Sequence, residues 1–371
     1  MYKNIIHLYI IYFSYNPMPI SENGIIYSII AVGIVFAVNL FGTRIKDSIS
    51  TESGENELIR KYLLNDSPLY GYNRPKLWIH TTYEYNARRW KSFGSRSSTD
   101  LNQPYIHLTV KSIIKHCGND FNVCLIDDDS FNQLIPNWTV KVSELPEPAR
   151  QYYRDLAMCE LLYIYGGMVV PNTFVCLRNL ASLYYKNVDD NIPFVCEMPN
   201  CYATLIQGQK WNLFTSNIRF MGAPKRSPVI REMAQYLKTR TDNGHVNAEP
   251  EFFGYTSKWV NHEVMRERFR LVDGVKIGVK TIDNKAIVLE NLLHSEPIML
   301  HHHTYGVLIP GDDILRRSCY QWFSVLPIEE LLKTDMAITK YILASLADKD
   351  EEDEDEEPSR DLYNERTVIS I

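Results

Sequence analysis

The stretch RDLAMCELLYIYGGMVVPNTFVCL, residues 154–177, decides the fold. Its first half predicts a helix, because apolar side chains from Leu156 to Tyr163 recur on one face at a period of 3.6 residues. Gly166 and Gly167 then end the helix, since glycine readily takes the left-handed conformation that a helix C-terminus needs. The chain can therefore turn sharply after Tyr165 and start a new element.

A short buried strand is predicted next, at Met168–Val170. Pro171 ends that strand, because proline has no N–H to donate to a strand ladder. The order helix, glycine pair, apolar strand and polar tip delivers a few side chains to the carboxyl end of one strand. Open α/β sheets bind their ligands at that end. The stretch predicts an α/β protein with a ligand site beside residues 171–173.

The same stretch resembles the sugar transferases of the GT-A fold that carry a DXD motif. Their pattern is Asp, two residues, Arg, then Leu-Tyr-x-Tyr-Gly-Gly, three residues and Asp-x-Asp. The residues that match it in identity and spacing are Asp155, Leu162, Tyr163, Tyr165, Gly166 and Gly167. The family's Arg falls on Met158, and its Asp-x-Asp falls on Pro171-Asn172-Thr173.

The resemblance continues in the flanking segments, roughly from Pro75 to Leu326. It implies a mostly parallel central sheet, Rossmann-like, with helices on both faces. His80 ends a first predicted strand, Lys76–His80, where the family has a histidine; a hydrogen-bonded histidine at a strand end is an equally good interpretation. The nucleotide-sugar-binding residues that the resemblance implies are His80, Asp155, Gly166, Gly167, Asn172, Thr173, Asn217 and His302.

The resemblance implies transfer of a sugar from a nucleotide-sugar donor to a glycan or protein acceptor. The family uses Mn²⁺ or Mg²⁺, held by its paired carboxylates against the diphosphate. Here Pro171 and Thr173 replace those carboxylates and Met158 replaces the cation, so no metal ligand and no catalytic residue is assigned. Three hypotheses remain. The first is an active transferase that uses Asp155 with acids elsewhere, such as Asp127 or Glu197. The second is a catalytically inactive transferase fold that binds a glycan, a nucleotide sugar or a protein partner, and the third is a membrane-anchored structural component that keeps the scaffold only for its shape.

Three consecutive acids, Asp127–Asp129, follow the second predicted strand, Phe121–Ile126. They have the chemistry of metal ligands, but acids at this place also cap and complement the N-terminus of a helix. We favour the capping role, with a helix that begins near Ser130.

The remaining pattern predicts a strand at 194–197 and another within 213–228. Helices are predicted at 108–116, 229–238 and 328–346. Glycine, proline and acids predict a loop at 244–258, and apolar residues predict a last strand at Ile298–His303.

Composition excludes some classes of function. The chain has 371 residues, a net charge of −6 and seven cysteines. No basic block points to a nucleic acid, and no Cys/His cluster has zinc-ligand spacing. A Cys196–Cys201 disulfide would require an oxidising lumen.

The chain divides into an N-terminal hydrophobic region (1–45), a stem (46–74), a transferase-like domain (75–347) and an acidic tail (348–371). The apolar run 25–41 predicts a single-pass membrane anchor, with a cleaved signal peptide as the alternative. Positive charges at Arg44 and Lys46 favour a cytosolic domain, whereas the resemblance favours a Golgi-like endomembrane lumen.

Overall fold

The computed structural model describes residues 74–81, 103–199, 213–242 and 249–347, all within one compact unit that spans residues 59–371. The predicted anchor, the stem apart from Arg74, the acidic tail and Cys201 lie outside the described residues. No helix in these ranges is both long and apolar enough to cross a bilayer.

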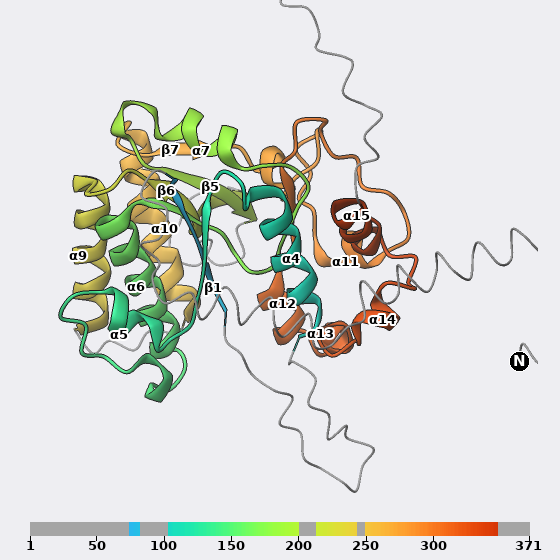
Figure 1. The fold of residues 1–371 in the computed structure, drawn as a ribbon, viewed down its shortest axis with the longest axis horizontal. Coiled ribbons are helices and arrows are strands. Elements are labelled where there is room, and N and C mark those ends of the chain that lie inside the picture. The colour runs from blue at the N-terminus through green and yellow to red at the C-terminus, as the bar shows by residue number, and fades with distance from the viewer. Residues whose placement is uncertain (1–73, 82–102, 200–212, 243–248, 348–371) are drawn as a thin grey trace, which may run out of the picture. The chain divides into compact units, whose positions relative to one another are not determined.

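In the part of the chain that the structure describes, eight strands form two sheets (Figure 1). The strands are β1 (Lys76–His80), β2 (Asn122–Ile126), β3 (Gly167–Val169), β4 (Phe174–Cys176), β5 (Phe194–Pro199), β6 (Phe214–Ala223), β7 (Arg270–Val272) and β8 (Gly306–Leu308). The central sheet has six strands in the order β2-β1-β3-β6-β5-β7, and β4 pairs with β8 separately. Only β6 runs against the other strands of the central sheet, so the prediction of a mostly parallel sheet is confirmed.

Helices cover both faces of this sheet and also surround the small β4–β8 sheet. They are α4 (Tyr105–Cys117), α5 (Ser130–Leu134), α6 (Ala149–Tyr165), α7 (Ala181–Val188), α9 (Pro228–Asp242), α10 (Glu249–Met265), α11 (Leu289–Leu293), α12 (Gly311–Arg316), α13 (Gln321–Ser324), α14 (Ile328–Leu331) and α15 (Ala337–Leu346). Short 3₁₀ turns occupy Val142–Glu144, Asp189–Asn191, Gly274–Ile277 and Ser318–Tyr320.

Alternate residues of β1 enter different hydrophobic cores. Trp78 packs with α6, α9 and α10 on one face, while Leu77 and Ile79 pack with α4 and α7 on the other. Figure 1 shows α6, α9 and α10 on one side of β1 and α4 on the other. All three side chains are fully buried. A parallel strand covered on both faces is apolar along its whole length, because neither row of side chains reaches water. This is why the run Leu77–Ile79 was readable as a buried strand.

The glycine pair has the scaffold role that its position predicted. α6 ends at Tyr165, and Gly166 follows with a φ of 70°. The Gly166 carbonyl accepts a buried hydrogen bond of 3.0 Å from the Trp78 indole. Gly167 has a φ of 101° and begins β3, which pairs with both β1 and β6. The turn therefore fixes the start of β3 against the strands on either side.

Three sequence predictions were wrong. The predicted loop at 244–258 contains the start of the long helix α10, because Pro250 stands in the first turn, where a helix tolerates proline. The predicted strand Ile298–His303 is irregular, and the strand of this region, β8, begins at Gly306. The predicted helix 328–346 is interrupted, since the Thr334 hydroxyl bonds the Leu331 carbonyl where α14 ends.

Candidate functional site

A pocket of about 400 Å³ opens at the carboxyl ends of β1 and β3. One wall is the turn Pro171–Thr173, which connects β3 to β4. His80 contributes the end of β1, Arg219 enters from β6, and the segment Pro310–Asp313 lines the side next to the turn, where Gly311 packs against Thr173. The helix α6 contributes Gln151 and Asp155, so strand ends, turns and a helix together position the polar groups of the pocket.

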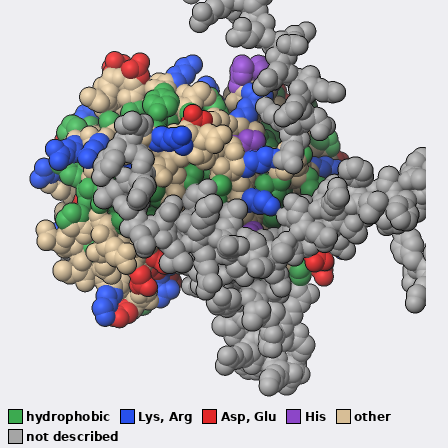
Figure 2. All heavy atoms as spheres, viewed as in Figure 1, with side chains coloured by type: hydrophobic (Ala, Val, Ile, Leu, Met, Phe, Trp, Pro, Cys, Tyr) green, Lys and Arg blue, Asp and Glu red, His purple; other side chains and the backbone are tan. Residues whose placement is uncertain are grey.

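The pocket brings together five of the side chains that the sequence had singled out. They are His80, Asp155, Asn172, Thr173 and Asn217. Gly166 and Gly167 do not line it, because they lie at the opposite end of β3, beside Lys225 and Lys76. His302 does not line it either: it lies on an exposed turn between His301 and His303, and Figure 2 shows histidine side chains at the molecular surface.

The turn at 171–173 is held by its backbone. The Ile309 amide donates to the Thr173 carbonyl over 3.1 Å, and the Thr109 hydroxyl donates to the Asn172 carbonyl. Within the described residues, the side chains of Asn172 and Thr173 make no hydrogen bond. Their amide and hydroxyl groups line the pocket as neutral donors and acceptors, which suit the hydroxyl groups of a sugar.

The residues present do not fit a divalent cation. Mg²⁺ and Mn²⁺ are held by oxygen ligands, chiefly carboxylates, and Pro171 offers no side-chain oxygen at all. Among the described residues no group of three or more metal-binding side chains converges. Asp155, the acid that matches the family's pattern, already accepts hydrogen bonds from Arg219 and Gln151.

Asp155 forms a buried ion pair with Arg219. Two guanidinium nitrogens approach the two carboxylate oxygens over 3.1 and 3.3 Å, and the Gln151 amide donates to the same carboxylate over 3.1 Å. The Asp155 side chain is 4% exposed, whereas that of Arg219 is 25% exposed. The third guanidinium nitrogen reaches the half-exposed Asp312 over 3.2 Å. A buried acid thus holds an arginine that presents part of its charge to the pocket.

Arg219 supplies a positive charge in the pocket, where the family's motif arginine is missing. Met158, which replaces the family's Arg, is buried in the same pocket beside Asp155. The sequence analysis missed Arg219, and alternation along the strand could not have found it. The register of β6 is irregular between Asn217 and Met221, and Ile218 and Phe220, two positions apart, enter different cores. The Asn217 side-chain oxygen accepts a 3.0 Å hydrogen bond from the Arg219 backbone N–H.

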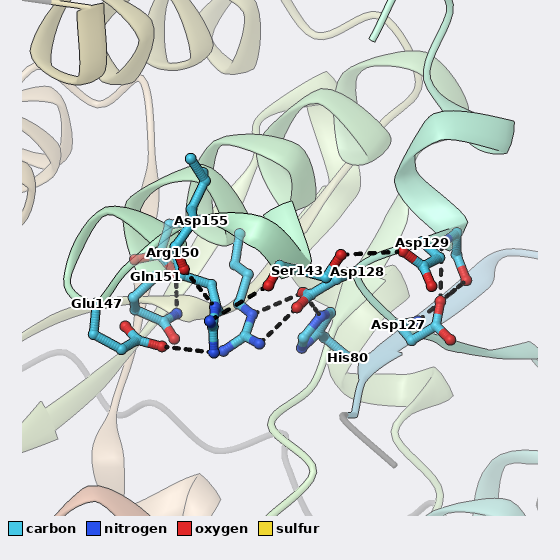
Figure 3. Close-up of polar contacts among 12 residues, drawn as sticks. His80, Asp127, Asp128, Asp129, Ser143, Glu147, Arg150, Gln151 and Asp155 are labelled. Atoms are coloured by element: carbon cyan, nitrogen blue, oxygen red, sulfur yellow. Dashed lines mark hydrogen bonds and ion pairs between the residues drawn. The ribbon is translucent and has the colours of Figure 1, made fainter. Parts of the chain in front are cut away.

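A second charged cluster links the ends of β1 and β2 to α6 (Figure 3). The Asp128 carboxylate accepts from His80 Nε2 over 2.9 Å and from Arg154 over 2.7 and 2.8 Å. The His80 ring stacks on Phe131 with 5.5 Å between ring centroids. Asp128 is therefore not a helix cap; within the acidic run it is Asp127 that accepts from the Ser130 backbone N–H at the start of α5.

Burial alone would raise the pKa of Asp128, but hydrogen bonds from Arg154 and His80 outweigh burial and hold that pKa well below its usual range. A carboxyl group whose pKa is lower in the folded state stabilises the fold above its unfolded pKa, about 3.9 for aspartate. That stabilisation disappears as the pH falls toward the folded pKa.

We expect Asp128→Asn to lower the free energy of unfolding by about 3 kcal/mol at pH 7, because it leaves Arg154 without its buried counter-charge. Urea unfolding at pH 7 and pH 3 checks this, and the gap between wild type and variant should narrow at pH 3. The matched control is Asp129→Asn at the neighbouring exposed acid, with an effect within about 0.5 kcal/mol. If the difference in unfolding free energy between wild type and variant is the same at both pH values, the lowered pKa of Asp128 does not contribute to stability as expected.

In comparisons with known proteins, no protein family matches the chain, and none of the curated proteins matches it. Among solved structures, the chain is similar to one titled "PaToxG Glycosyltransferase", with 13% sequence identity and a TM-score of 0.30. The similarity covers 53% of this chain and 72% of that chain. A TM-score this low carries no argument about function. What the fold and the pocket define is an α/β protein with an arginine-containing ligand pocket at the carboxyl edge of its sheet.

Proposed function

We propose that this chain is a sugar-transferase-like protein: the pocket binds a nucleoside-diphosphate sugar, and arginine charge takes the place of a metal ion in transfer of the sugar to a glycan or protein acceptor. The observation that carries the proposal is the position of Arg219, held on the pocket wall by the buried Asp155. A second supporting observation is that no cluster of metal-binding side chains occurs among the described residues.

The form of the pocket supports this proposal. Pockets for small molecules usually have volumes of about 300–1,000 Å³ and combine an apolar lining with a few convergent polar groups. Here Ile287 and Leu308 contribute apolar surface, and Phe253 lies 5.2 Å from the Arg219 guanidinium. Gln151, Asn172 and the other neutral groups suit hydroxyl groups, while the arginine suits a phosphate.

The chemistry of the donor explains why the arginine matters. When the bond between the sugar and the diphosphate breaks, negative charge builds up on the departing diphosphate. A guanidinium group stabilises that charge through paired, charge-assisted hydrogen bonds. The Arg219 nitrogen that now bonds the half-exposed Asp312 could exchange this carboxylate for a phosphate oxygen, while Asp155 keeps the side chain in place.

The proposal predicts metal-independent donor binding. Full-length protein would be titrated by calorimetry with UDP-glucose, UDP-N-acetylglucosamine and GDP-mannose, with Mn²⁺ or with EDTA, and nucleotide release would be assayed in parallel. We expect one donor to bind with a Kd that EDTA changes by less than about threefold, since Pro171 and Thr173 replace the carboxylate pair that would bind a metal against the phosphates. Binding that disappears in EDTA would contradict the arginine role, and absence of binding would contradict the function.

The second candidate function is a catalytically inactive transferase fold that binds a nucleotide sugar or a partner. The replacement of both motif carboxylates by Pro171 and Thr173 favours it, because it removes the family's route to transfer. Saturable binding without nucleotide release would identify this case. Membrane attachment through residues 25–41 stays a proposal of the same kind, since these residues lie outside the described ranges.

A further inference from the structure

Two of the seven cysteines lie in contact inside the protein. The Cys117 and Cys176 sulfurs are 3.8 Å apart, although 59 positions of sequence separate the two residues. Cys117 ends α4 and Cys176 ends β4. Among the described cysteines no other pair of sulfurs lies this close. We propose that Cys117 and Cys176 form a disulfide when the chain folds under oxidising conditions.

The geometry requires little movement. A disulfide needs its two sulfurs about 2 Å apart, so each side chain must bring its sulfur closer by less than about 1 Å. The backbones already lie side by side, because the Cys176 amide donates to the Ser112 hydroxyl of α4 over 2.9 Å. On the other side, the Cys176 carbonyl accepts from the Ser345 hydroxyl of α15. The bond can therefore close by rotation of the two side chains.

The surroundings of the pair determine when the bond can form. Both side chains are fully buried, and they share one core with Ile113, Phe121 and Leu183. Buried thiols do not react with an oxidant in solution. The disulfide must therefore form before α4 packs on β4, or while this contact is open. Once the core has closed, it shields the uncharged disulfide from reductants.

The step is thiol–disulfide exchange with a small disulfide such as oxidised glutathione. One protein thiol loses its proton and attacks the disulfide, so that a mixed disulfide forms and one glutathione leaves as the thiolate. The second protein thiol, deprotonated in turn, attacks the protein sulfur of the mixed disulfide, and the second glutathione leaves. The two protein sulfurs lose two electrons, and two molecules of reduced glutathione carry away these electrons and the two protons.

The bond braces one wall of the pocket. α4 already holds the turn at 171–173, because its Thr109 hydroxyl donates to the Asn172 carbonyl. β4 begins at Phe174, directly after that turn. The loop of chain that the disulfide closes contains α6 and β3, and with them Asp155 and the turn. Closing a long loop stabilises a fold mainly by restricting the unfolded chain.

The test uses full-length protein made by cell-free synthesis in detergent, either with a mixture of oxidised and reduced glutathione or with dithiothreitol. Free thiols are alkylated in denaturant, and disulfide-linked peptides are identified by mass spectrometry. The variants are Cys117→Ala and Cys176→Ala. The matched control is Cys159→Ala, at another fully buried cysteine, whose sulfur contacts the Ile230 carbonyl.

We expect most of the wild type made with glutathione to carry a link between the Cys117 and Cys176 peptides, and none of the protein made with dithiothreitol to carry it. The linked protein should have a Tm at least about 5 °C above that of its reduced form, because the closed loop is long. This difference should persist in Cys159→Ala and vanish in Cys117→Ala and Cys176→Ala. Each variant is compared with its own reduced form, so lost core packing does not affect the comparison.

Several results would overturn the proposal. Alkylation of both Cys117 and Cys176 in wild type that folded with glutathione shows that these thiols do not pair. A link from either of them to Cys196, Cys201 or Cys319 in their place shows that another pairing is preferred. Linked protein with a Tm below that of the reduced form, or wild type that folds only with dithiothreitol, shows that the bond does not fit this fold.

Discussion

Gly167→Ala should destabilise the protein strongly, by as much as the loss of a buried counter-charge. The backbone of Gly167 has a φ of 101°, which side-chain-bearing residues rarely adopt. An added Cβ would lie 2.1 Å from the Lys76 carbonyl oxygen, inside the contact between β1 and β3. Because the obstacle is backbone of the neighbouring strand, no side-chain rotation can relieve it.

Strained backbone costs about 1–3 kcal/mol and overpacking a further 1–3 kcal/mol. We therefore expect Gly167→Ala to lower the free energy of unfolding by about 3–5 kcal/mol, a large part of the 5–15 kcal/mol typical of a folded domain. Urea unfolding and soluble yield measure the effect.

Gly222→Ala is the matched comparison, because Gly222 lies in the same sheet opposite Met168. The three atoms nearest to its added Cβ all belong to the Phe194 ring, the closest at 2.3 Å, and its φ is not positive. We expect a loss of about 1–3 kcal/mol from overpacking alone. If Gly167→Ala costs no more than Gly222→Ala, β1 and β3 do not approach each other as described.

Arg219→Met should weaken both the fold and the binding of donor. It leaves the Asp155 carboxylate, 4% exposed, without its counter-charge, and such a loss costs about 3–5 kcal/mol. It also removes the guanidinium proposed to hold the diphosphate. A charge-assisted hydrogen bond contributes about 1.5–3 kcal/mol, so the Kd for UDP-sugars should rise about 10- to 100-fold.

A double variant separates the two effects. Arg219→Met combined with Asp155→Leu removes both charges, and replacement of a whole buried pair by apolar groups is often nearly neutral for stability. We expect it to regain most of the unfolding free energy while donor binding stays weak. Arg219→Lys should keep part of the binding, since lysine retains the charge but not the paired geometry.

Arg231→Met, at an exposed arginine on α9 that packs over Tyr163, is the control for loss of one positive charge. It should leave donor affinity unchanged. Donor affinity that survives Arg219→Met in a folded protein would remove Arg219 from the binding site and, with it, the main support for the proposed function.

Local patterns identified the centre of the fold. The run Leu77–Ile79 was recognisable as a strand because both of its faces are apolar, and the end of α6 was recognisable because Gly166 is the residue that turns there most easily. Both signals act within a few residues of chain. For the same reason the loop predicted over Pro250 was wrong: proline and acids also occur in the first turn of a helix, and only the packing of Phe252 and Phe253 into the core tells the two apart.

The candidate site, too, could be predicted from the sequence only in part. The sequence by itself determined that His80 and the turn at 171–173 each end a strand. The tertiary structure decided that these two strands, β1 and β3, are parallel neighbours whose carboxyl ends meet at one edge. Only the tertiary structure decided what balances the charges there: Arg219 meets Asp155 across 64 positions of sequence, and Arg154 meets Asp128 across 26. An ion pair depends on distance in space, which the order of residues does not encode. Asp155 bonds Arg219, whereas Asp313 lines the pocket without a side-chain partner among the described residues. This difference between the two carboxylates therefore became visible only in the folded structure.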